Sequence, residues 1–183
     1  MRLPITLVPL ALAACGSQPS VTAQNASVEE VNAKMMAAGG ATFLSPGQWR
    51  STVTVSKLDM PGLPPEAMKA VQAELTKPRQ TLSCLTPEQA KKPAADFFAG
   101  KDSKDCRYDH FRMEGGKLDA KMTCSAGGQA MVAAFDGTYA PETFKLAMTM
   151  KGARGGAAAA ASMPDMALTV DSRRVGACTG KEG

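Results

Sequence analysis

Residues with reactive side chains are scarce in this chain, whose 183 residues include one histidine, one tryptophan and two tyrosines. A lone histidine with no carboxylate and nucleophile placed beside it cannot form a catalytic triad. The net charge is +4 at pH 7, or +3 once Arg2 is removed, and few aromatic residues lie among the basic ones. We therefore expect neither an enzyme nor a nucleic-acid-binding protein.

Metal-binding patterns and long apolar runs are also missing. None of the five cysteines has the Cys-x-x-Cys spacing, which argues against zinc ribbons and thioredoxin-like redox motifs. Asp96, Asp102 and Asp105 lie in a polar segment that lacks the spacing of a calcium loop. No apolar run after residue 15 is long enough to cross a bilayer. We expect no metal, no cofactor and no spanning helix.

The N-terminus has the pattern of an exported protein. Arg2 precedes an apolar run over residues 5–14, which is typical of a signal peptide and too short to span a bilayer. The sequence LAAC that ends at Cys15 resembles the bacterial lipobox. That resemblance implies cleavage before Cys15, its acylation, and a lipid-anchored, periplasm-facing protein of the bacterial cell envelope. The following Gly16 and Ser17, with no aspartate, resemble an outer-membrane sorting signal.

The chain divides into four expected segments: a signal peptide (1–14), a lipidated cysteine with a flexible tether and short helix (15–45), a disulfide-stapled β domain (46–179) and a tail (180–183). The short helix is indicated by a capping-box spacing between Ser27 and Glu30. Gly39 is the expected end of this helix.

Alternation of apolar and polar residues dominates the β domain. Six segments carry this pattern and predict about seven strands; they are residues 49–58, 79–84, 106–124, 130–139, 143–151 and 167–178. One buried apolar face and one solvent-exposed polar face are typical of antiparallel sheets. The predicted fold is mainly β, an antiparallel meander forming a curved sheet or a small barrel.

Two helical inserts interrupt the strands. Residues 63–78 place Met68, Val71 and Leu75 on one stripe, with proline at both ends. Residues 86–93 begin with a capping box. The alanine-rich residues 151–164 are expected to form a loop between the last two strands.

Cys106 and Cys124 lie at equal distances from Gly115, inside a Glu-Gly-Gly sequence. A hairpin folded symmetrically about this glycine places the two cysteines opposite one another. The other expected cross-strand pairs are Tyr108–Met122, Asp109–Lys121 and Met113–Lys117, the last of which closes a three-residue loop.

Export into an oxidising compartment favours disulfides for the four cysteines other than Cys15. The hairpin predicts a bond between Cys106 and Cys124, worth about 3 kcal/mol in the chain-entropy model. Cys84 and Cys178 remain as the second pair, which closes a longer loop worth about 4–5 kcal/mol. We expect structural crosslinks rather than reactive thiols.

These landmarks carry a resemblance to a known family. Gly47-Gln48-Trp49, Cys84, the Cys106–Cys124 hairpin and the sequence RVGAC that ends at Cys178 occur in that order. Together they resemble a proteobacterial envelope family known as the domain of unknown function numbered 3617, over roughly residues 45–179. The resemblance implies an exported protein, often a lipoprotein, without an established activity. The GGAAAAA sequence does not fit a tight turn between two strands.

A second resemblance is to lipocalins, which also begin with Gly-x-Trp and place a late arginine against that tryptophan. It implies a small lipocalin-like barrel and a structural contact between Trp49 and Arg174. Arg174 shares strand parity with Leu168 and Val170 and is therefore expected to point inward. A desolvated guanidinium on the indole face would contribute about 1–2 kcal/mol.

The expected function is that of a non-catalytic binding module, which takes an apolar small ligand or an envelope protein partner. The expected pocket lining consists of Tyr108, Met122, Phe144, Leu146, Met148 and Met150. His110, expected on the same face as Tyr108, is assigned a structural role. The alternatives are an envelope enzyme or a Cu(I)-binding protein using thioethers; the methionines considered for copper are Met148, Met150, Met163 and Met166.

Overall fold

The computed structural model describes residues 20–38, 43–60, 62–91, 103–126, 129–152 and 165–180. Several predictions lie outside these residues: the signal peptide, the acylation of Cys15, the helix end at Gly39, the polar residues Asp96 and Asp102, the methionine Met163, and nearly all of the alanine-rich loop and the tail.

The described residues form one antiparallel sheet of eight strands: β1 (Val21–Ser27), β2 (Gly47–Asp59), β3 (Arg79–Leu85), β4 (Cys106–Glu114), β5 (Lys117–Ala126), β6 (Gln129–Ala140), β7 (Thr143–Gly152) and β8 (Asp165–Gly176). Their order across the sheet is β1-β4-β5-β6-β7-β8-β2-β3, so β4 to β8 form a meander. The prediction of a mainly β, antiparallel fold is confirmed.

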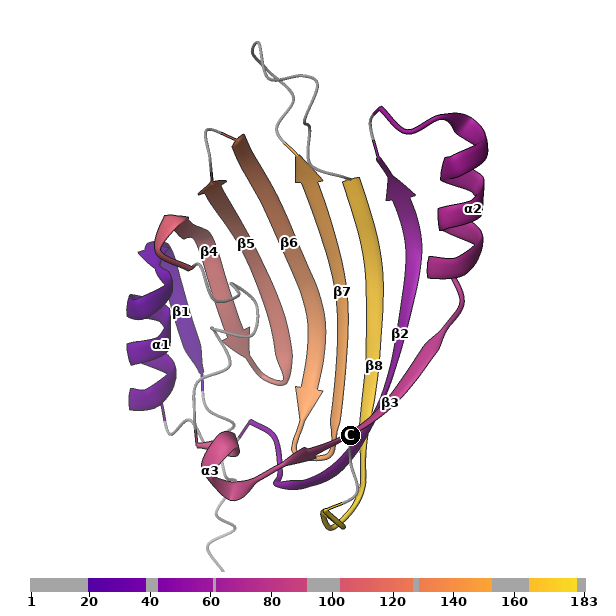
Figure 1. Ribbon diagram of the computed structural model, residues 1–183. Coiled ribbons are helices and arrows are strands. Elements are labelled where there is room, and N and C mark those ends of the chain that lie inside the picture. Colours follow the sequence, from indigo (N-terminus) through magenta and orange to yellow (C-terminus); the bar gives the residue numbers. More distant parts are fainter. Residues whose placement is uncertain are drawn as a thin grey trace, which may run out of the picture.

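The sheet is curved and open (Figure 1). Strands β1 and β3 occupy its two edges and do not pair with each other in the described part of the chain. The curved-sheet form of the prediction is therefore confirmed, whereas the closed, lipocalin-like barrel is wrong. A closed barrel needs pairing between its first and last strands, which the present order lacks.

Three short helices accompany the sheet: α1 (Val28–Ala37), α2 (Pro65–Leu75) and α3 (Pro87–Ala90). Ser27 and Glu30 form the predicted capping box of α1, because the Ser27 Oγ accepts from the Glu30 amide at 3.1 Å and the Glu30 carboxylate accepts from the Ser27 amide at 2.7 Å. Thr86 and Gln89 form the corresponding box of α3. In α2 the predicted stripe is half-buried, and the Gln72 side chain donates to the Leu58 carbonyl at 2.8 Å.

The flexible spacer expected before α1 is partly wrong. Residues 21–27 form strand β1, which pairs with β4, and Val28, Val31 and Met35 of α1 are almost completely buried. Figure 1 places α1 beside β1 at one edge of the sheet. Residues 21–37, which lie before the predicted start of the β domain at residue 46, are therefore part of the fold.

One extra residue on β4 displaces every later pair of the predicted β4–β5 hairpin by one position, so the predicted pairs Asp109–Lys121 and Met113–Lys117 are wrong. Cys106 faces Cys124 and Tyr108 faces Met122 as expected, but a register shift after Tyr108 places His110, not Asp109, opposite Lys121. The loop consequently shortens to Gly115 and Gly116, with φ of 57° and 76°. Glycine adopts such positive angles without a steric cost, as a two-residue hairpin turn requires.

The two faces of the sheet differ in burial. On the face that we call the inner face, Trp49, Tyr108, Phe111, Phe135 and Leu146 are each at most 5% exposed. The opposite face, which we call the outer face, carries charged side chains such as Lys145 and Asp171, which form an ion pair at 2.8 Å. The hydrophobic core gathers on the inner face of β1, β4, β5 and β6, and α1 packs against β1 and β4 at one edge of the sheet.

Candidate functional site

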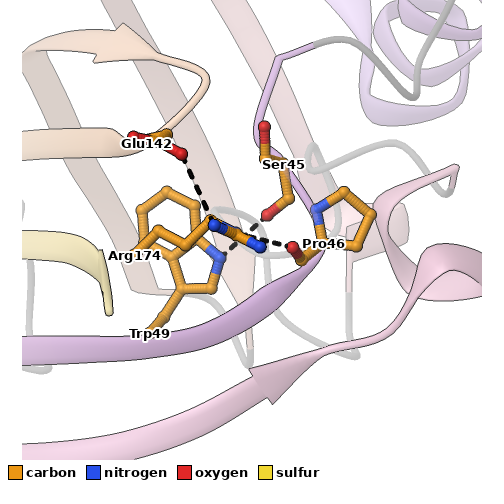
Figure 2. A network of polar contacts seen from close by, with 5 residues as sticks. All are labelled: Ser45, Pro46, Trp49, Glu142 and Arg174. Atoms are coloured by element: carbon orange, nitrogen blue, oxygen red, sulfur yellow. Dashed lines mark hydrogen bonds and ion pairs between the residues drawn. The ribbon is translucent and has the colours of Figure 1, made fainter. Parts of the chain in front are cut away.

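Trp49 and Arg174 are neighbours where β2 begins (Figure 2), since they are Cα partners on β2 and β8. The indole Nε1 donates to the Ser45 carbonyl at 3.0 Å. The Arg174 guanidinium donates through Nε to the Pro46 carbonyl at 2.8 Å, and its Nη1 lies 3.4 Å from Glu142 Oε1. Two oxygen acceptors therefore fix the guanidinium beside the indole, while stacking on the ring face stays a prediction.

Gly47 makes room for this arrangement. A Cβ atom at position 47 would lie 2.6 Å from Arg174 Nε and even closer to the Gly176 carbonyl oxygen, and the φ angle of Gly47 is +144°. Only glycine combines that backbone angle with such a close approach. The glycine of the Gly-x-Trp motif thus lets the arginine reach across the end of β2. The motif alone gave no sign that Pro46 and Glu142 complete the cluster.

Both predicted disulfides are present. Cys106 is bonded to Cys124, with Cα atoms 4.0 Å apart, and Cys84 is bonded to Cys178, with Cα atoms 5.4 Å apart. The second bond joins the edge strand β3 to the chain just after β8, and both of these strands pair with β2. It therefore clamps the end of β2 that holds Trp49.

The expected pocket lining divides into two groups. Tyr108, Met122 and Leu146 are at most 4% exposed and belong to the core. The expectation that these three line an accessible pocket is wrong, because each of them is enclosed in the hydrophobic core. Phe144 and Met148 remain partly exposed on the inner face. Met150 is also partly exposed.

A continuous part of the inner face remains partly exposed on β7, β8 and β2. Its side chains are apolar, and we call them the apolar strip: Val53, Val55, Met148, Met150, Leu168 and Val170. The register aligns them in rows, with Val53 opposite Val170 and Val55 opposite Leu168. Met148, Met150 and Val170 also pack against the hydrophobic core, so the apolar strip continues the core towards solvent.

A pair of hydroxyls borders the apolar strip. Ser51 and Ser172 are Cα partners, and the Ser172 hydroxyl donates to the Ser51 hydroxyl at 2.8 Å. Ser172 is 7% exposed. Because each hydroxyl carries one hydrogen, the pair has one further donor left for a polar group nearby. The side chains on the inner face of β8 thus become more polar along the strand, from Val170 through Ser172 to Arg174. The sequence analysis did not predict this order.

Methionines gather at the other end of the strip. Met150 and Met166 are Cα partners on β7 and β8, and Met148 lies two residues from Met150 on the same face. Strand parity alone accounts for Met148 and Met150 as lining. The pairing with Met166 depends on the register between two strands, which the sequence did not reveal.

His110 lies on the outer face, and its predicted position on the face of Tyr108 is wrong. The register shift after Tyr108 turns it away from the core. Its Nε2 lies 2.8 Å from Asp119 Oδ1, and the two side chains are 41% and 60% exposed. Lys121 donates to Asp109 nearby, and that hydrogen bond lowers the pKa of the Asp109 carboxyl. These are solvated surface pairs.

No group of three or more His, Cys, Asp or Glu side chains that could hold a metal ion occurs among the residues described above. Within the same residues, no helix has the length and apolar character needed to cross a bilayer.

The fold defines an open antiparallel sheet whose inner face is sealed over β1, β4, β5 and β6 and partly exposed over β7, β8 and β2. A family model described as a protein of unknown function, DUF3617, matches residues 44–178. The chain belongs to this family, as the order of its tryptophan, cysteine and arginine landmarks had indicated. No curated protein and no solved structure matches the chain.

Proposed function

We propose that this chain is a non-catalytic binding protein of the bacterial cell envelope, anchored at the membrane by a lipid on Cys15. In this proposal the apolar strip receives the hydrocarbon part of an amphipathic ligand, such as a fatty acid or another single acyl chain. The Ser51–Ser172 pair then meets the polar end of the ligand.

The partly exposed apolar strip is the observation that carries the proposal. On the neighbouring strands the side chains of the same inner face are buried in the hydrophobic core, with Phe135 2% exposed and Tyr108 fully buried. Leaving the strip accessible to water is unfavourable by about 25 cal/mol for each Å² of apolar surface. A ligand that covers the strip recovers this free energy, and methionine side chains adapt to its shape.

The polar border supports an amphipathic ligand over a purely apolar one. The remaining hydroxyl hydrogen of the Ser51–Ser172 pair suits a carboxylate or an ester oxygen. Reaching that hydrogen from the strip requires the ligand to lie along β8, with its polar end towards Arg174.

The anchor and the compartment are supported by the sequence around Cys15. The two disulfides are consistent with export, because such bonds persist mainly in oxidising compartments.

Binding of a fluorescent long-chain fatty acid tests the ligand proposal. Met148→Glu places a charge on the strip, and the matched control Ala147→Glu places the same charge one residue away on the exposed outer face. We expect saturable binding by the wild-type chain and the control, and a loss of at least tenfold in Met148→Glu. Equal binding by the two variants, with circular dichroism showing both folded, contradicts the proposal.

The hydroxyl pair has its own test. Replacing both Ser51 and Ser172 with alanine removes the polar contact and should weaken fatty-acid binding about fivefold or more, as expected for a lost hydrogen bond to a charged group. Binding of an alkane of the same length should change less than twofold. An equal change in affinity for both ligands excludes a role of the hydroxyl pair in recognising the polar end of the ligand.

Copper(I) is a second candidate ligand, supported by the pairing of Met150 with Met166 and the proximity of Met148. Thioethers are soft ligands suited to Cu(I). Titration with Cu(I) in competition with a chromogenic chelator should then show binding that disappears in the Met150→Leu, Met166→Leu double variant. Unchanged copper affinity in that variant rules this site out.

A further inference from the structure

Two arginines face one another on the outer face without a counter-charge. Arg50 on β2 and Arg173 on β8 are Cα partners, and both side chains are exposed. Neither forms an ion pair with any described residue. Like charges placed directly opposite on adjacent strands repel one another. An anion bound between them removes this repulsion.

The neighbouring carboxylates are already engaged. Asp171, the next outer-face residue of β8, lies 2.8 Å from Lys145 Nζ. Glu142, which precedes the β7 partner of Arg173, pairs with Arg174 at 3.4 Å. The two unpaired guanidinium groups therefore keep their hydrogen-bond donors for an external anion. Guanidinium geometry suits phosphate especially well, because it offers two parallel N–H donors.

Exposed apolar side chains flank the arginines. Leu82, the β3 partner of Arg50, is 41% exposed, and Val175, two residues beyond Arg173, is 36% exposed. Of the large apolar residues in the described part of the chain, only Met36, on α1, is comparably exposed. We call Arg50, Arg173, Leu82 and Val175 the arginine corner.

We propose that the arginine corner docks on a membrane surface rich in anionic phospholipid. The two guanidinium groups bind lipid phosphates, while Leu82 and Val175 enter the apolar boundary below the headgroups. Adjacent cationic and apolar side chains on one surface are typical of interfacial membrane contacts. The surface lies on the opposite face from the apolar strip, so docking leaves the inner face accessible. The proposal rests on neither the strip nor its ligand.

Vesicle flotation at low ionic strength tests this proposal with a chain that begins at Gly16 and carries no acyl group. This chain retains every strand and helix of the described structure. The vesicles consist of phosphatidylcholine with or without phosphatidylglycerol. We expect binding only to the anionic vesicles, and weaker binding as salt screens the charges.

The variants distinguish binding by the two arginines from attraction by the net positive charge of the chain. Arg50→Gln and Arg173→Gln should each lower binding to anionic vesicles about fivefold, and the double variant about 25-fold, since each arginine near such a surface contributes about 1 kcal/mol. The matched control replaces Lys57 and Lys151 with glutamine. These exposed cations lie on the same face at the opposite end of β2 and β7. The control should change binding less than twofold. Leu82→Asn should weaken binding without altering its dependence on salt.

Three results overturn the proposal. Equal losses in the arginine and lysine double variants show attraction by net charge alone. Equal binding to vesicles with and without phosphatidylglycerol excludes recognition of anionic lipid. Shifts of the arginine side-chain NMR signals on adding inorganic phosphate, without any flotation, show a site for a free anion. Circular dichroism of each variant confirms that the sheet is intact.

Discussion

Replacing Gly47 with alanine tests the packing at the Trp49 end of the sheet. The new Cβ would lie 2.6 Å from Arg174 Nε, so the guanidinium must move and lose its 2.8 Å hydrogen bond to the Pro46 carbonyl. The backbone angle of +144° adds strain of about 1–3 kcal/mol for any residue with a side chain. Losing this partly buried hydrogen bond costs about a further 1 kcal/mol.

Gly176→Ala is the matched control for this prediction. Gly176 also has a positive φ, +157°, but a Cβ there meets no atom within 4 Å. Urea unfolding followed by fluorescence of the buried Trp49 should show that Gly47→Ala is less stable than Gly176→Ala by about 1–3 kcal/mol, because the new Cβ displaces the arginine and also collides with the Gly176 carbonyl oxygen. Equal stability of the two variants refutes the argument that Gly47 is needed for the reach of Arg174.

Three further predictions follow from burial and crosslinking. Replacing both Cys84 and Cys178 with serine should lower the free energy of unfolding by about 4–5 kcal/mol; a loss under 1 kcal/mol in urea titrations contradicts the clamp. In the same titrations Phe111→Ala should lower the free energy of unfolding by about 3–5 kcal/mol and Met148→Ala by less than about 2 kcal/mol, because only Phe111 is fully buried. Equal losses in the two variants would contradict the partial exposure of the apolar strip. Burial raises the pKa of Tyr139 above its usual value of 10.0, so the unfolded chain ionises first and stability falls as pH rises above about 10; a Tyr139→Phe variant with an unchanged alkaline pH profile would contradict this origin.

The sequence predicted the elements whose signals are local. Symmetry of the thiols about Gly115 was enough to pair Cys106 with Cys124, and elimination then paired Cys84 with Cys178. The alternating pattern of β7 correctly separated Leu146 and Met148 from the polar residues between them. These inferences need only the period of a strand and the geometry of a turn.

Features that depend on contacts between distant segments were missed. Residues 21–27 read as a polar spacer because their sequence, VTAQNAS, carries little hydrophobic signal; they form a strand because β4 offers them an edge. The shift at Asp109 left no trace in the pattern, yet it moved His110 to the outer face. Likewise, strand parity placed Tyr108 and Met148 on one face, but it could not show that the core buries Tyr108 completely and Met148 only in part.

Native mass spectrometry of the protein, extracted from its own envelope in mild detergent, tests the central claim most directly. The account predicts a polypeptide with two disulfides and an acyl group on Cys15, together with a non-covalent adduct having the mass of a single-chain lipid. The adduct should be lost in Met148→Glu and kept in Ala147→Glu. Acylated protein without any adduct, or an adduct that survives in both variants, contradicts the claim that the apolar strip holds a ligand.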